Sequence, residues 1–272
     1  MFQLGINLDN EAQKPASEIA PGWDFSEIPV GEFLAPFNSD AWWAQRKAHI
    51  LSLPVAPIKA TSHLLHHFGL VASGPDVDWE QVEFWVRRAF ERVAELGTIQ
   101  VVGCFGGHFP VPEGFPRSKA MDQAIRFCNL LADLAQPLGI KIALEPYSGT
   151  NLLFRRYLEG LAFAREVNRP EIRLMADLNY FLALNQDLWD IAQAPEMLVH
   201  AHIAGEHGQP GVGNLVDFHT RFFRVLKAIG YEGTVSAACP WVSTEGEKLD
   251  LRKETAKSLR YLQELRDKVY AE

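Results

Sequence analysis

The feature that most constrains the fold is an alternation of short apolar runs with longer amphipathic ones. Eight such short runs recur along the 272 residues of the chain. Most are nearly continuous in apolar side chains, which is typical of parallel strands that are covered on both faces. The predicted strands are residues 2–7, 27–30, 57–61, 99–104, 140–145, 172–177, 198–204 and 233–238.

Segments with helix signals lie between these strands. Asp78 is placed to cap a helix whose apolar residues recur at helical spacing until Gly97 ends it. The other predicted helices are residues 41–53, 118–138, 153–167, 186–192, 216–229 and 248–270. Eight strands, each followed by a crossover, predict a closed (β/α)8 TIM barrel, with residues 1–272 as one domain. A doubly wound open sheet is the alternative, but Gly5 alone does not form its glycine-rich first turn.

Composition and charge exclude several classes of protein. A net charge of −8 disfavours a nucleic-acid partner, because that affinity comes mainly from neutralised phosphates. No apolar run approaches the roughly 20 residues that span a bilayer, and the first residues do not form a signal peptide. The three cysteines are widely spaced and do not form a disulfide framework. We therefore expect a cytoplasmic protein with reduced cysteines and no membrane partner.

Three consecutive predicted strands end in polar side chains that can bind a metal. These are Glu145, Asp177 and His202, and active sites of such barrels lie at this end of the strands. A lone buried carboxylate is costly, and a shared divalent cation would satisfy all three groups. Two carboxylates and an imidazole suit Mn²⁺, our favoured ion, and also Mg²⁺, Zn²⁺ or Fe²⁺. Alternatively, an Arg or Lys neutralises each acid and His202 is a hydrogen-bonded core histidine.

Four segments around these strand ends carry a family resemblance. Residues 102–115 (VGCFGGHFPVPEGF) are similar to a glycine-rich loop after a fourth strand, and residues 142–146 (IALEP) to a segment with a catalytic Glu. Residues 172–177 (IRLMAD) and 200–203 (HAHI) are similar to segments that supply an Asp and a His ligand. In this order and spacing, they resemble the sugar phosphate isomerase/epimerase family of xylose isomerase-like barrels, over essentially the whole chain.

The resemblance implies a function and a set of residue roles. It implies a metal-dependent isomerase or epimerase that acts on a small sugar or sugar derivative by proton transfer next to a carbonyl. Glu145 would be both catalytic base and metal ligand, with Asp177 and His202 as the other ligands. Members of the family often pair or tetramerise, so a homo-oligomer is also expected.

The chain departs from the family pattern at two positions that matter for catalysis. Ala238 stands where the family usually has a second Glu at the end of strand eight, and Tyr180 stands where a His is common. One remaining carboxylate still supports isomerisation on one face of a substrate, or an elimination. The alternatives are therefore a metal-dependent lyase or dehydratase on the same barrel, or a carbohydrate-binding relative without catalysis. Endonuclease activity is disfavoured, because the cluster of His and Asp ligands that it needs is missing.

Residues that follow the predicted strands are candidates for substrate binding. His66 follows strand three, His108 strand four, Tyr180 strand six and Trp241 strand eight. Aromatic rings at a barrel mouth can stack on a sugar face, although they can equally cover the core, and loop histidines are more often solvent-facing. We predict that His66, His108, Tyr180 and Trp241 contact the substrate.

Overall fold

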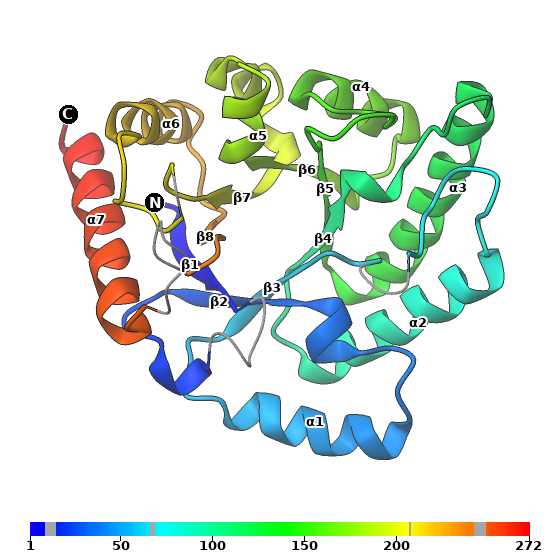
Figure 1. The fold of residues 1–272 in the computed structure, drawn as a ribbon, viewed down its shortest axis with the longest axis horizontal. Coiled ribbons are helices and arrows are strands. Elements are labelled where there is room, and N and C mark those ends of the chain that lie inside the picture. Colours follow the sequence, from blue (N-terminus) through cyan, green and yellow to red (C-terminus); the bar gives the residue numbers. More distant parts are fainter. Residues whose placement is uncertain (9–14, 66–68, 207, 242–248) are drawn as a thin grey trace.

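Eight parallel strands close into a barrel in which each strand pairs with the next and β8 pairs with β1, as the sequence predicts (Figure 1). The structure is a computed structural model and describes residues 1–8, 15–65, 69–206, 208–241 and 249–272. The strands are β1 Gln3–Asn7, β2 Phe25–Pro29, β3 Ile58–Ser62, β4 Val101–Phe105, β5 Lys141–Glu145, β6 Ile172–Asp177, β7 Leu198–Ile203 and β8 Thr234–Ala237.

The helices surround this barrel (Figure 1). The α-helices are α1 Asp40–Ser52, α2 Trp79–Leu96, α3 Arg117–Ala135, α4 Tyr157–Val167, α5 Leu178–Ala183, α6 Val216–Ala228 and α7 Leu251–Ala271. Short helical turns are η1 Ala16–Glu18, η2 Val30–Leu34, η3 Gly106–His108, η4 Gln136–Leu138, η5 Leu188–Gln193 and η6 Pro195–Met197. The apolar stripe predicted for α2 is buried against the barrel, and the side chain of Asp78 caps the helix by accepting from the amide of Gln81.

Two predicted elements differ from the structure in ways that bear on the site. The α-helix expected at residues 186–192 is the 3₁₀ turn η5, and α5 instead begins directly after β6, because the Asp177 side chain caps it. The second strand is Phe25–Pro29 rather than residues 27–30, since the Phe25 side chain also belongs to the barrel interior. Glu27 therefore lies in the middle of a strand and not at its start.

An apolar layer fills the barrel interior towards the amino ends of the strands. Its side chains are Phe25, Ala60, Val101, Ala143 and Met175. The Phe25 ring occupies the space next to Gly5, where a Cβ would lie only 2.2 Å from the ring, so this strand position requires glycine. Because side chains alternate along a strand, the residues two positions further on point into the same interior, nearer the carboxyl end.

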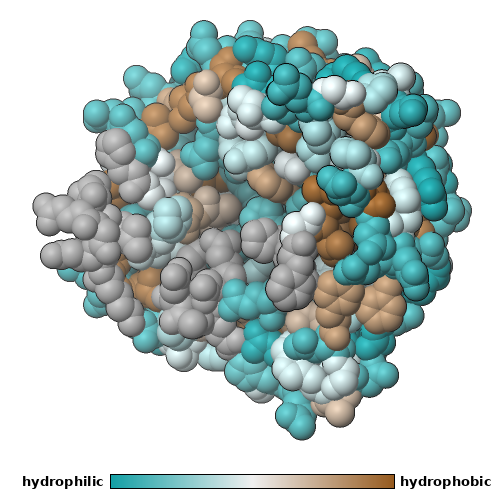
Figure 2. All heavy atoms as spheres, turned by 45° about the vertical axis from the view of Figure 1, so that its right-hand side comes forward, coloured by the Kyte–Doolittle hydropathy of each residue, from teal (hydrophilic) through white to brown (hydrophobic). Residues whose placement is uncertain are grey.

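Within the described ranges, no helix combines the length and the apolar character needed to cross a bilayer. The face in Figure 2 is mostly hydrophilic, with small apolar areas between polar side chains. Arg266 of α7 donates to the carbonyl of Phe2, which ties the last helix to the residue just before β1.

Candidate metal and catalytic site

Glu145, Asp177 and His202 converge inside the carboxyl end of the barrel. They end or nearly end β5, β6 and β7, and Asp177 is in register with His202. The Nδ1 atom of His202 lies 3.7 Å from Oε1 of Glu145 and 3.6 Å from Oδ2 of Asp177. All three side chains are buried, and their potential ligand atoms lie within 4.8 Å of one another. The structure therefore assembles the three residues that the strand ends predict.

The two carboxylate oxygens of Asp177 face different partners. Its Oδ1 accepts a hydrogen bond from the amide of Asn179 at 2.7 Å, which starts α5. Its Oδ2 is left to face the imidazole of His202. The helix cap thus fixes the rotamer that points the other oxygen into the site.

Burial dominates the electrostatics of Glu145. Loss of hydration raises the pKa of its carboxyl to about 8, and the nearby Asp177 and Glu27 act in the same direction while His202 opposes them. Within the described part of the chain, no Arg or Lys forms an ion pair with Glu145 or Asp177. The alternative in which basic side chains neutralise these acids therefore does not hold for the described residues.

This donor set fits a divalent cation. Two carboxylates and one imidazole nitrogen are ligands that Mn²⁺, Mg²⁺, Zn²⁺ and Fe²⁺ accept. A cation between them would also balance a buried acid pair that otherwise forces protonation of Glu145.

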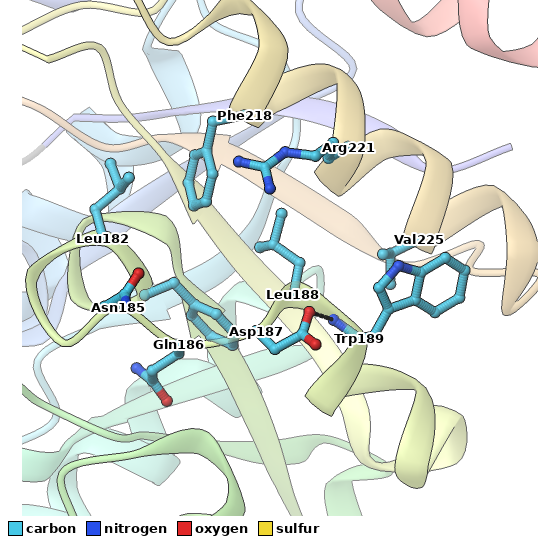
Figure 3. Close-up of a pocket in the computed structure, with 10 residues that line it drawn as sticks. Leu182, Asn185, Gln186, Asp187, Leu188, Trp189, Phe218, Arg221 and Val225 are labelled. Carbon is cyan, nitrogen blue, oxygen red and sulfur yellow. Dashed lines mark hydrogen bonds between the residues drawn. The ribbon is translucent and has the colours of Figure 1, made fainter.

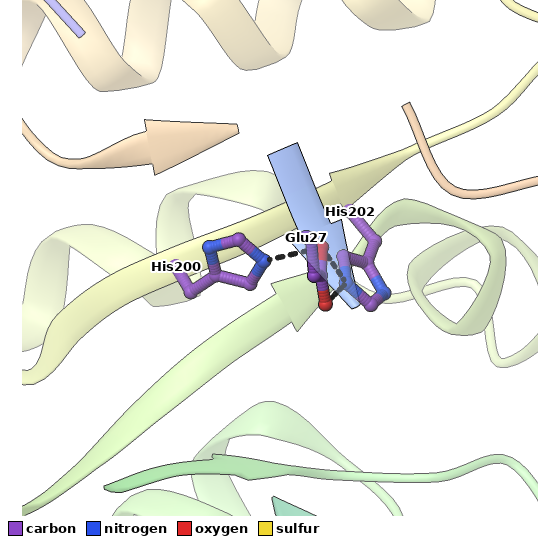
Figure 4. A group of neighbouring side chains, drawn as sticks. All are labelled: Glu27, His200 and His202. Atoms are coloured by element: carbon purple, nitrogen blue, oxygen red, sulfur yellow. Dashed lines mark hydrogen bonds and ion pairs between the residues drawn. The ribbon is translucent and has the colours of Figure 1, made fainter. Parts of the chain in front are cut away.

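Glu27 is a fourth charged residue in this cluster, and the sequence analysis missed it. The side chain is only 1% exposed, and its carboxylate accepts from Nε2 of His202 at 3.0 and 3.2 Å (Figure 4). Nε2 of His200 lies 3.2 Å from the same carboxylate. Two signals could have pointed to it: an acid inside an otherwise buried strand, and the first histidine of the HAHI segment.

The pKa values of Glu27, His202 and His200 do not all shift in the same direction. Burial alone would raise the pKa of Glu27, but His202 and then His200 outweigh it and hold this pKa well below its usual range. Burial would lower the pKa of His202, but Glu27 and Asp177 hold it well above its usual range. Burial lowers the pKa of His200, which is therefore a neutral imidazole near pH 7.

Aromatic side chains line one side of the cluster. The ring centroids of Phe105 and Tyr147 are 4.3 Å apart, those of Tyr147 and Tyr180 are 4.9 Å apart, and Phe105 lies 5.5 Å from His108. Gly106 allows the β4 loop to lie against β5, since a Cβ there would be 2.4 Å from the carbonyl oxygen of Glu145. The glycine-rich segment thus brings the aromatic side chains close to the candidate base.

The four predicted substrate contacts lie in different places. Tyr180 is in the first turn of α5; burial, and then Glu145 and Asp177, raise the pKa of its phenol, which places it beside the acid pair. His108 is buried in η3 beside Phe105. Trp241 is buried just after β8, in the cluster between barrel and helices. His66 lies outside the described residues.

Strand eight contributes no carboxylate at this end. Ser236 is in register with His202 and is buried, and its hydroxyl has no hydrogen-bond partner in the described residues. Ala238 lies two residues further on and is half-buried, and its amide donates to the carbonyl of Ile203. The backbone at Ala238 therefore continues the strand pairing, and the missing ligand is a matter of side chain alone.

A separate groove lies on the outside of the barrel, between the α5–η5 segment and α6 (Figure 3). Its volume is about 500 Å³. Its lining includes Leu182, Trp189, Phe218 and Arg221 and none of the clustered acids or histidines. The Asp187 carboxylate in it accepts from the amide of Trp189 as the cap of η5, so the groove offers no comparable acid–base group.

Comparisons with known proteins identify the family and the fold of the chain. The sequence model of a family described as a xylose isomerase-like TIM barrel matches residues 20–265. An L-ribulose 3-epimerase of Methylomonas sp. (strain DH-1) is 33% identical over 159 residues, which are 56% of this chain and 53% of the relative. The match therefore spans only about half of that relative's length.

Two solved structures show the same fold. A D-psicose 3-epimerase in the presence of D-fructose has a TM-score of 0.77 at 18% identity, with 97% of this chain and 99% of that chain covered. The IolI protein with a bound zinc atom has a TM-score of 0.74 at 18% identity, with 98% and 99% covered. At this level of identity, the likeness is one of fold.

Proposed function

This chain belongs to the family of xylose isomerase-like TIM barrels, and we propose that it is a metal-dependent sugar epimerase that acts on a small ketose, at a carbon next to the carbonyl. The observation that carries the proposal is the convergence of Glu145, Asp177 and His202 from three consecutive strands. The L-ribulose 3-epimerase relative supports the substrate class and the reaction. We also propose that residues 1–272 form one domain, which the pairing of β8 with β1 supports.

Glu145, Asp177 and His202 would hold the divalent cation, with Mn²⁺ as the proposed ion and Mg²⁺, Zn²⁺ or Fe²⁺ as alternatives. Such an ion would polarise the substrate carbonyl and favour the negative charge that develops on its oxygen. The hydrogen bond from the Asn179 amide holds the Asp177 carboxylate in place, and hydrogen bonds to Glu27 hold the His202 imidazole.

Glu145 is the proposed base that removes the proton from the carbon next to the carbonyl. With a cation bound beside it, the Glu145 carboxyl would be ionised, which is the state that can accept a proton. Tyr180 and His108 are proposed to contact the sugar near this base, together with the adjacent rings of Tyr147 and Phe105. Trp241 and His66 remain proposed substrate contacts on the strength of their positions in the sequence.

Epimerisation also needs a proton donor for the other face of the planar carbon. Ala238 cannot supply one, and Tyr180 is the proposed replacement because its phenol, a hydrogen-bond donor, lies close enough to Glu145 and Asp177 to interact with both. Neither a dehydratase reaction nor a purely carbohydrate-binding role is favoured by the site or by the relatives.

The test is an exchange experiment with ketopentoses and ketohexoses in D₂O, using the Mn²⁺-loaded protein and NMR detection. We expect deuterium at carbon 3 together with the carbon 3 epimer, and the loss of both after chelation of the metal. Formation of an aldose would instead assign aldose–ketose isomerisation. A dehydrated product would support the lyase, and no exchange with any sugar would contradict the proposal.

A further inference from the structure

We propose that Glu27 is a positioning residue for the metal site, because its carboxylate holds the His202 imidazole with Nδ1 facing Glu145 and Asp177. This inference rests on the proposed function, since it concerns the same metal site. It adds a residue from β2, a strand that contributes none of the three proposed ligands. Glu27 acts on the metal only through His202.

The two ring nitrogens of His202 face different partners. Nε2 lies 3.0 and 3.2 Å from the two oxygens of Glu27, whereas Nδ1 lies 3.6 and 3.7 Å from the Asp177 and Glu145 oxygens. An ionised carboxylate only accepts hydrogen bonds, so Nε2 carries the proton. In the neutral imidazole, the lone pair is then on Nδ1, directed at the acid pair. Carboxylate partners of this kind orient metal-binding histidines and raise their basicity.

Glu27 is itself held in place from the opposite side. His200 Nε2 lies 3.2 Å from Oε2 of Glu27, and His200 Nδ1 lies 2.7 Å from the hydroxyl of Thr234 (Figure 4 shows the Glu27 contacts). With Nε2 donating to the carboxylate, Nδ1 must accept from the Thr234 hydroxyl. The Phe25 ring packs edge-on against His200 at 6.2 Å. A chain of hydrogen bonds therefore runs from β8 through His200 and Glu27 to His202.

Glu27, His200 and His202 form a second group of side chains that has the composition of a cation site. Ligand atoms of Glu27, His200 and His202 also lie within 4.8 Å of one another, and all three residues are buried. However, two cations would have to share the His202 ring and displace both of its protons. The observed distances instead pair each donor with an acceptor, so the proposal requires one ion per chain.

The experiment compares the full chain with E27Q by Mn²⁺ titration calorimetry and, in the Zn²⁺-loaded state, by ¹⁵N NMR of the histidine side chains. We expect E27Q to bind one ion about 10–100-fold more weakly, as for loss of other partners of metal-binding histidines. The spectrum of the parent protein should show Nδ1 of His202 bound to metal and Nε2 protonated. In E27Q, this single tautomer should give way to a mixture.

The control is E171Q, which makes the same change in another buried carboxylate. Glu171 is 7% exposed, precedes β6 at the opposite end of the barrel and lies 3.6 Å from Arg169. We expect E171Q to leave the Mn²⁺ affinity and the NMR signals of His202 unchanged. If E27Q does not fold, T234V loosens the same chain at His200 and should shift both readouts in the same direction by a smaller amount.

Three results would overturn the inference, and they are distinguishable. A folded E27Q with parental affinity and parental His202 signals would show that Glu27 does not position the ligand. Two ions in the parent and one in E27Q would make Glu27 a ligand. A parent protein that binds no ion would refute the proposed metal site itself, and the inference with it.

Discussion

The two sides of the barrel mouth contribute different things to the site. On one side, β5, β6 and β7 present Glu145, Asp177 and His202. On the other, β8 presents Ser236, Ala238 lies two residues further along the chain, and β2 places Glu27 against Nε2 of His202. The site is therefore asymmetric: one side carries the proposed ligands and base, and the other holds the His202 imidazole through the Glu27 carboxylate.

The largest effect is expected for Glu145→Gln, on the ligand side. The substitution keeps the shape of the side chain but removes the base, and loss of a general base costs roughly 10²–10⁴-fold in turnover. The measurement is the rate of deuterium exchange at carbon 3 of the best substrate, with thermal unfolding as the check on folding. Parental turnover in Glu145→Gln would show that another group is the base.

Asp177→Asn and His202→Ala should weaken binding of the same ion. Loss of a residue that only hydrogen-bonds to a metal ligand typically costs roughly 10–100-fold in metal affinity. Asp177 and His202 would contact the ion directly, so each substitution should lower Mn²⁺ affinity by at least that much. Because both groups would contact one ion, their effects should not add, with an interaction of about 0.5–3 kcal/mol. Calorimetric titration of both single variants and the double variant measures this. Additive losses would mean that the two residues do not share an ion.

Ala238→Glu would add a carboxylate at the end of β8, which lacks one. Ala238 lies two residues after Ser236, which is in register with His202, so a longer side chain there points into the same interior. We expect the variant to bind Mn²⁺ about tenfold or more tightly than the parent, as the converse of losing a ligand contact. Unchanged affinity from an already tight parent would show that another group completes the site.

The pH dependence of stability in the metal-free protein tests the same asymmetry without a substitution in the parent protein. The pKa of Glu145 is raised from 4.5 to about 8 in the folded state, so its stabilising contribution is present below 4.5 and is lost as pH rises towards 8. The pKa of His202 is also raised, so its stabilising contribution is present below pH 6.5 and is lost as pH rises above that value. Glu27, with a lowered pKa, stabilises above 4.5 and loses this as pH falls further.

The free energy of unfolding should therefore fall from weakly acidic pH towards pH 8, by at most about 1.4 kcal/mol per pH unit for each group. Urea unfolding with a chelator present, at a series of pH values, measures this slope. In Glu145→Gln, the part of the slope that Glu145 causes should disappear. A slope of the same size in the variant would assign the effect to other groups.

The sequence by itself determined the barrel and the positions of the three residues that we propose as metal ligands. Parallel strands that are buried on both faces carry near-continuous apolar runs, and a barrel brings all their carboxyl ends to one rim. Glu145, Asp177 and His202 each lie at such an end, so their proximity follows from strand order and register alone. The absence of a carboxylate at Ala238 was noticed only because the resembling family usually has a Glu at that position.

Only the tertiary structure decided what supports the site. Glu27 and His202 are 175 residues apart, and they meet because β8 closes onto β1 and β1 pairs with β2. The start of the second strand also depended on packing, since Phe25 enters the barrel where Gly5 leaves room for its ring. Periodicity reports which faces of a strand are buried, but not which buried side chains meet across a closed barrel. That meeting depends on closure and side-chain volume, which no local pattern contains.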